Sequence, residues 1–206
     1  MHKTFISYHH ANEQDLKDEI IEKFGGEHFI NKSVNDGDID PSNTEDTIMR
    51  TIRKDYLSDS TVTVILVGIE TAQRPFVNSE LQASLWGSNP NGLLAVVRDD
   101  LYDLIFTKGT CSDLNCNCGI TLRLPTSYYK TCLPDLVYKN RQFHQSVPHF
   151  DDTEVYCSLI RYSTFISNPE KYIDEAFEKK RKGFEIKKKL NPETPRIGHN
   201  NMLFVN

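Results

Sequence analysis

The sequence predicts an α/β fold in which a central parallel sheet is covered by helices. Short apolar segments alternate with helix-like segments from Thr4 to Val97. Such alternation with short connections favours parallel crossovers over hairpins. The segment 61–67 is β-branched and apolar on both faces, which is typical of a strand in the middle of a parallel sheet. It should be the central strand.

The first half of the chain contains the expected strands near 4–7, 29–31, 62–67 and 93–97. Asn12 and Ser42 are the expected caps of the first two helices, and Glu45 completes a capping-box pattern with Ser42. A third helix should cover 76–87. The apolar faces of the first two helices are formed by Leu16, Ile20, Ile21, Phe24, and by Ile48, Ile52, Tyr56.

The second half is harder to assign because Cys, Asn, Pro and Tyr residues interrupt every period between 98 and 150. We expect a decorated, irregular region there and a last strand within 155–165. Asn168-Pro169 predicts a helix start with Asn as the cap. The lysines and arginine of 179–182 should form a solvated helix end. A single domain over 1–190 and a loosely ordered tail over 191–206 complete the expected organisation.

Composition limits the class of protein. The chain has 206 residues, 38% of them hydrophobic and 26% charged, which is typical of a soluble globular domain. No apolar run approaches the roughly 20 residues that cross a bilayer, so no membrane partner is expected. The first residues lack a secretory signal, which predicts a cytoplasmic protein. The net charge of −5 argues against a nucleic-acid partner.

Five cysteines, an odd number, do not indicate a disulfide framework in a reducing compartment. Cys111, Cys116 and Cys118 lie close together in sequence. Structural zinc sites usually pair ligands two to four residues apart, and the Cys-x-Cys spacing has no second tight pair. The expectation is therefore no metal ion, and thiols that are solvated or packed.

Signatures of common catalytic sites are missing: the sequence has no Gly-x-Gly-x-x-Gly after the first strand, no phosphate-binding Gly-Lys-Ser/Thr loop, no Gly-x-Ser-x-Gly and no zincin helix. Glu80 remains, near the start of the helix that follows the central strand, where open α/β sheets place their ligand crevice. A single carboxylate suits cleavage of an N-glycosidic bond whose leaving group already carries positive charge, such as the nicotinamide of NAD.

Four segments, taken in their order and spacing, resemble the TIR-like family, and within it the TIR-like component of the Thoeris antiphage-defence system, the ThsB type. They are 3–9, 35–39, 62–68 and 76–81. The resemblance covers about residues 1–100, with a weaker echo at 168–177. It implies a flavodoxin-like three-layer fold and an enzyme that consumes NAD as substrate, without a separate cofactor. It further implies an ADP-ribose-derived signal, cyclic or conjugated, that reaches a downstream effector, and a homo-oligomer on activation.

The resemblance also assigns roles to individual residues. Glu80 matches the catalytic glutamate. Phe76 stands where many TIR enzymes have Trp. The remaining expected substrate-binding residues are Phe5 and Ser7 beside the first strand, His9 just after it, and Asp36 and Gly37 in a mobile loop over the pocket.

Simpler explanations exist for the same residues. Glu80 suits a helix start through the helix dipole alone, Asp36 and Gly37 are typical turn residues, and His9 and His10 would also fit a solvated loop. The chain would then be a catalytically silent adaptor that acts by homotypic assembly. A binding module for flavin mononucleotide is a third possibility, which the sequence supports least because 8–12 is poor in Ser, Thr and Gly.

Overall fold

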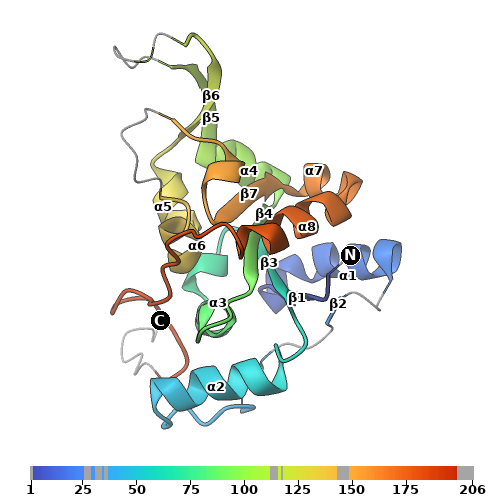
Figure 1. Cartoon of the computed structure of the whole chain (residues 1–206), viewed down its shortest axis with the longest axis vertical. Coiled ribbons are helices and arrows are strands. Elements are labelled where there is room, and N and C mark those ends of the chain that lie inside the picture. The colour runs from blue at the N-terminus through green and yellow to red at the C-terminus, as the bar shows by residue number, and fades with distance from the viewer. Residues whose placement is uncertain are drawn as a thin grey trace.

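A five-stranded, fully parallel sheet forms the centre of the computed structural model, which describes residues 2–25, 29–30, 34, 37–111, 116, 118–142 and 149–198 (Figure 1). The strand order is β2-β1-β3-β4-β7. This order is flavodoxin-like and confirms the predicted fold class. The strands are β1 (Thr4–Ser7), β2 (Phe29–Ile30), β3 (Val62–Val67), β4 (Gly92–Val97) and β7 (Cys157–Arg161).

The central strand β3 is buried on both faces, as its composition predicts. Ile65 and Val67 pack into one hydrophobic cluster, whereas Val62, Val64 and Leu66 pack into another. Successive side chains of a strand point to opposite faces, so each face of β3 contributes to its own core. Both faces must therefore be covered by helices.

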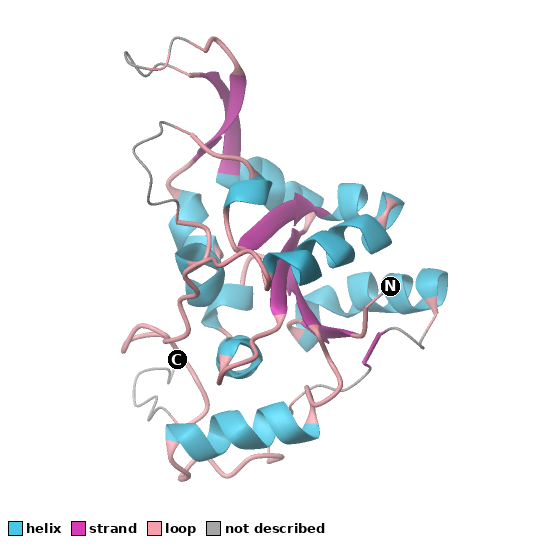
Figure 2. Cartoon of the chain, in the orientation of Figure 1, coloured by secondary structure: helices cyan, strands magenta, loops and turns pink. Residues whose placement is uncertain are grey.

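Helices cover the two faces in separate layers (Figure 2). One core cluster joins the sheet to α1 (His10–Phe24), α7 (Tyr162–Ser167) and α8 (Pro169–Lys179). The other joins it to α3 (Pro75–Leu85), α4 (Asp99–Ile105), α5 (Tyr128–Cys132) and α6 (Asp135–Lys139). Helix α2 (Glu45–Asp55) packs against α3. Two short 3₁₀ turns, Thr71–Gln73 and Asp152–Glu154, complete the elements.

The first two helices begin elsewhere than predicted. His9, not Asn12, precedes α1, and its carbonyl accepts from the backbone N–H of Glu13 at 2.9 Å. Thr44, not Ser42, caps α2 by accepting from the backbone N–H of Thr47 at 3.3 Å. Ser42 is engaged in a turn, where both its backbone N–H and its hydroxyl donate to the Asp40 carboxylate. Asn168 does cap α8, as expected.

The region that the sequence left irregular contains α4, α5, α6 and an antiparallel hairpin, β5 (Phe106–Thr110) with β6 (Thr121–Pro125). The hairpin projects from the body of the molecule (Figure 1). The expected strand over 155–165 is shorter, because residues from Tyr162 onward form α7. Among the helices of the described residues, none is long and apolar enough to cross a membrane.

Two features near the C-terminus differ from expectation. Lys179 is buried, and its ammonium donates to Ser158 Oγ at 2.6 Å and to the carbonyl of Asp152. Residues 191–198 are docked on α3 instead of lying loose. Asn78 Nδ2 donates to the carbonyl of Pro195 at 2.9 Å, and Ser79 Oγ accepts from the backbone N–H of Ile197 at 3.0 Å. Residues 199–206 lie outside the described part of the chain.

Candidate active site

Glu80 lies in the second turn of α3, beside the carboxyl end of β1. Helix α3 follows β3 through the turn Thr71–Gln73. This connection places the start of α3 at the carboxyl ends of the strands. Pro75 opens the helix, where its missing N–H costs no hydrogen bond. The Glu80 side chain is only 2% exposed. The strand order reverses between β1 and β3, so Glu80 stands at the switch point where doubly wound sheets bind ligands.

Two donors hold the Glu80 carboxylate. Ser7 Oγ, on the last residue of β1, donates to Oε2 at 2.7 Å. The backbone N–H of Val34 donates to Oε1 at 3.0 Å. Both oxygens are thus fixed by groups that lie 73 and 46 residues away in the chain. The carboxylate is oriented before any ligand arrives, as electrostatic catalysis requires.

Burial dominates the ionisation of Glu80. Loss of hydration raises the pKa of Glu80 to about 7, and the hydrogen bonds from Ser7 and Val34 oppose part of that rise. Among the described residues, no cation contributes to this rise in the pKa of Glu80. A carboxyl group with a pKa near neutrality carries a substantial fraction of both protonation states at physiological pH. Perturbation of this kind, in a carboxyl group that borders a cavity, is a marker of functional sites.

A cavity of about 310 Å³ opens beside Glu80. This volume is at the lower end of the range of about 300–1,000 Å³ typical of ligand pockets. Its walls come from the segment after β1, from Val34 and from the start of α3. The lining residues are Tyr8, His9, His10, Val34, Arg74, Pro75, Phe76, Val77 and Glu80.

Arg74 gives one wall of the cavity a positive charge. It precedes Pro75 at the N-terminus of α3, where the helix dipole is also positive. Its guanidinium pairs with the exposed carboxylate of Glu70, whereas its Nε is buried and has no hydrogen-bond partner in the part of the chain that the structure describes. The combination of a helix N-terminus and an arginine suits an anionic group such as a phosphate.

His9 is held beside the cavity by a second buried carboxylate. The backbone N–H of His9 donates to Glu13 Oε2 at 3.3 Å, and Thr71 Oγ1 donates to the same oxygen at 3.1 Å. Burial raises the pKa of Glu13 and lowers that of His9. Glu13 fits only because residue 68 is glycine: a Cβ there would lie 2.0 Å from Glu13 Oε1.

The structure brings together most of the site residues expected from the sequence. His9, Phe76 and Glu80 line the cavity, and Ser7 contacts Glu80 directly. Phe5 does not line it, because its side chain is fully buried among core residues of α2 and α3. Gly37 is exposed in a turn with a φ of 88° and is not part of the cavity wall. Asp36 lies outside the described residues.

Sequence reasoning missed Tyr8, Val34 and Arg74. Tyr8 lies between Ser7 and His9, and Arg74 lies two residues before Phe76. Their positions at the end of the first strand and at the start of the helix therefore indicated that they could line the cavity. Val34 reaches Glu80 through its backbone, for which the sequence holds no signal. Trp86, at the C-terminal end of α3, packs against the core cluster that contains Phe5.

Comparison with known proteins agrees with this arrangement. Residues 5–102, just under half of the chain, match the family described as Thoeris protein ThsB, TIR-like domain. The TIR-like resemblance inferred from the sequence is thus confirmed over residues 5–102. No curated protein matches the chain. The family associates the protein with antiphage defence. The TIR-like match runs from β1 into α4 and includes Ser7, Glu80 and every residue that lines the cavity.

Proposed function

We propose that this protein is an enzyme that cleaves the nicotinamide N-glycosidic bond of NAD and makes an ADP-ribose-derived signal in antiphage defence. The observation that carries the proposal is the buried carboxylate of Glu80, fixed by Ser7 and Val34 at the edge of a cavity. The TIR-like family supports it independently.

Cleavage of this bond requires one negatively charged group from the protein and no general acid. Nicotinamide leaves NAD as a neutral molecule when the bond to the ribose C1′ breaks, so no general acid is needed. Positive charge then grows on the ribose, and the Glu80 carboxylate offsets it. The site is largely dehydrated, as the burial of Glu80 shows, and a charge in such surroundings interacts more strongly than in water.

The other residues that line the cavity suit the nicotinamide, the ribose and the diphosphate of NAD. Phe76 and Tyr8 offer apolar surface beside Glu80 for the nicotinamide and ribose. Arg74 and the N-terminus of α3 suit the diphosphate. The cavity accommodates one end of the dinucleotide, and the adenosine would extend beyond it. The Val34 N–H now occupies Glu80 Oε1, so a ribose hydroxyl that binds this oxygen must replace or share that contact.

In this proposal the protein acts in the cytoplasm as a homo-oligomer once activated. Its product, cyclic or conjugated, diffuses to a downstream effector. The acceptor that attacks the ribose carbon decides the product: water gives ADP-ribose, a group of the same nucleotide gives a cyclic isomer, and a second metabolite gives a conjugate.

The test is nicotinamide release from NAD by the purified chain and in phage-infected cells that express it, followed by mass spectrometry of the nucleotide products. Wild type should release nicotinamide, and Glu80→Gln should reduce the rate by about 10²–10³-fold, as expected for loss of one preorganised electrostatic contact.

Glu70→Gln is the matched control. Glu70 lies in the turn after the same strand and pairs with Arg74, but its side chain is half exposed and makes no contact with Glu80. The control should retain near-normal turnover at saturating NAD. If Glu80→Gln protects cells from phage as well as wild type does and no NAD product forms, the silent-adaptor function replaces the enzymatic one.

A further inference from the structure

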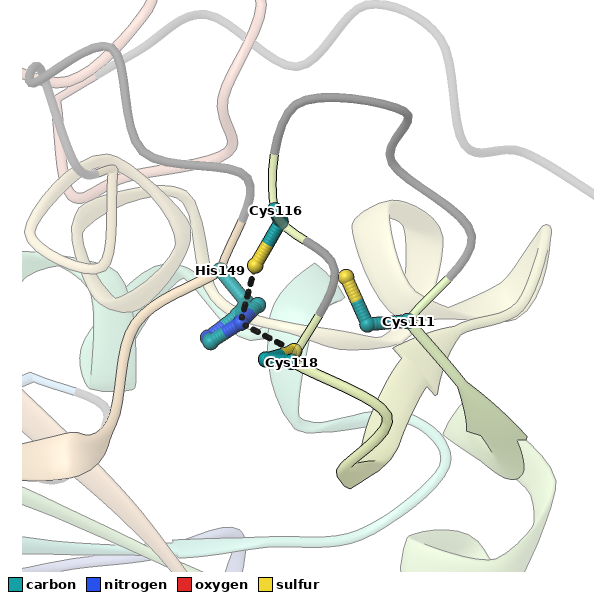
Figure 3. A group of neighbouring side chains, drawn as sticks. All are labelled: Cys111, Cys116, Cys118 and His149. Carbon is teal, nitrogen blue, oxygen red and sulfur yellow. Dashed lines mark hydrogen bonds between the residues drawn. The ribbon is translucent and has the colours of Figure 1, made fainter.

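Three cysteines and one histidine converge at the far end of the β5–β6 hairpin (Figure 3). Cys111 directly follows β5, whereas Cys116 and Cys118 lie in the connection to β6. His149 comes from a separate segment that leads into the turn Asp152–Glu154. Their thiol sulfurs and one ring nitrogen all lie within 4.8 Å of one another. None of these residues belongs to the Glu80 cavity.

The distances fit a tetrahedral metal site. His149 Nε2 lies 3.3 Å from Cys116 Sγ and 3.3 Å from Cys118 Sγ. Zinc binds thiolate sulfur at about 2.3 Å and imidazole nitrogen at about 2.0–2.1 Å, so the ligand atoms around a tetrahedral zinc stand about 3.5–3.8 Å apart. The cluster needs only small adjustments of side chains to reach that geometry.

We propose that Cys111, Cys116, Cys118 and His149 bind one Zn²⁺ ion in a closed, structural site. Three sulfurs and one imidazole nitrogen form a donor set that selects zinc over magnesium or calcium, which prefer oxygen ligands. All four coordination positions are filled by protein, which is typical of structural and not of catalytic zinc. Binding is not a redox step: each thiol releases its proton as its sulfur binds the ion, and the neutral imidazole binds through Nε2.

The surroundings explain what the ion would do. Most side chains of β5 and β6 are exposed, so the hairpin buries little apolar surface, and an isolated two-stranded hairpin is marginally stable. Backbone pairing nevertheless continues to the cluster, because the N–H of Cys111 donates to the carbonyl of Ile120 at 3.1 Å. A zinc ion would close the hairpin at the point where its ladder ends.

The ion would also join the hairpin to a second segment that already contacts the middle of β6. Arg123 of β6 pairs with Asp152 at 2.7 Å, and Asp152 lies three residues after His149. Zinc would add a second link between the same two segments, at the tip of the hairpin, beyond the Thr110–Thr121 pair. Two separated links fix the orientation of the hairpin, whereas one would leave it free to pivot. This role explains why the fourth ligand comes from outside the hairpin.

The site departs from the spacing used to exclude zinc above. In most structural zinc sites the four ligands form two pairs, each closely spaced in the sequence. Here three ligands lie within eight residues, and the fourth lies 31 residues further on. A sequence search for paired spacings does not find such a set.

The experiment measures metal in the full-length protein, purified without chelator, by inductively coupled plasma mass spectrometry. We expect about one Zn²⁺ per chain. The double variant Cys118→Ser/His149→Ala should retain only trace zinc. Cys132→Ala is the matched control, because Cys132 is buried in the main core, away from the cluster, and this variant should keep its zinc.

A second measurement covers the case in which a variant fails to fold. Wild-type protein stripped of zinc under reducing conditions and reloaded with Co²⁺ should show the charge-transfer and ligand-field absorption of tetrahedral cobalt thiolate. Hydrogen exchange of β5 and β6 should be faster in the stripped protein and return to its original rate when zinc is added back. Both readouts are independent of any NAD-cleaving activity.

Three outcomes would overturn the proposal. The first is purified, folded protein that holds no zinc and binds none when it is added. The second is a disulfide between two of the three cysteines in protein kept under reducing conditions. The third is full zinc content in the double variant.

Discussion

Replacing Glu80 by Gln should stabilise the fold at neutral and alkaline pH while it removes activity. Burial raises the pKa of Glu80 from 4.5 to about 7 in the folded chain. Between these values the folded state binds more protons than the unfolded state, so stability falls as pH rises through this window and levels off above about 7. Gln cannot ionise and therefore avoids this loss.

The magnitude follows from the size of the shift. At about 1.4 kcal/mol per pH unit, ionisation of the buried group costs about 3–4 kcal/mol well above pH 7. Gln resembles the protonated acid, since its carbonyl can accept from the Val34 N–H and its amide can donate to Ser7 Oγ. In a chain of this size, a gain of about 3 kcal/mol raises the melting temperature by about 6–12 °C.

The assay is thermal and urea unfolding of both proteins from pH 4.5 to 8.5. The two curves should nearly coincide at the acidic end and separate as pH rises, with Glu80→Gln the more stable protein. Glu70→Gln, at a half-exposed carboxylate, should show no comparable pH-dependent gain. A stability difference that does not change with pH, or a less stable Glu80→Gln at pH 8, would refute the assignment of a dehydrated, ionisable Glu80.

The other predictions concern the same carboxylate and two ion pairs outside the cavity, one around Asp152 and one between Asp103 and Arg161. For wild type, kcat/KM for nicotinamide release should rise with pH through about 7, because the ionised form of Glu80 offsets the ribose charge; a flat profile would contradict this role. Ser7→Ala removes a hydrogen bond that lowers the pKa of Glu80, so the midpoint should move to higher pH, with about 1 kcal/mol lost in stability. Asp152→Asn leaves the buried Arg141 without its ion-pair partner and should cost about 3–5 kcal/mol in denaturant unfolding. Asp103→Asn, which breaks an exposed pair with Arg161, should cost less than about 1 kcal/mol in the same assay.

The sheet was predictable because each strand carries its own signal. The segment around β3 is apolar on both faces, and only a strand between two helical layers tolerates that pattern. Glu80 was predictable for a related reason: it follows the central strand, and the carboxyl ends of parallel strands share one edge. The signal in both cases is local, within one element and the turn after it.

What could not be predicted depends on contacts between distant segments. Phe5 and Ser7 lie on the same face of β1, but two residues separate them by about 7 Å along the strand. Ser7 therefore reaches Glu80 at the sheet edge, whereas Phe5 packs deeper in the core. The Val34 contact is made by backbone, and the histidine of the cysteine cluster comes from a remote segment. No residue type or spacing in the sequence encodes these approaches.

The pairing of β4 with β7 has a consequence for how this protein can be divided. Residues 5–102 correspond to the family match, yet β4 is completed by a strand from 157–161, and α3 is held by backbone groups of Pro195 and Ile197. A fragment that ended at residue 102 would expose the whole edge of β4, an apolar template for pairing with other chains. Expressed alone, the fragment that ends at residue 102 should aggregate. The shortest fragment that folds independently should extend to about residue 198.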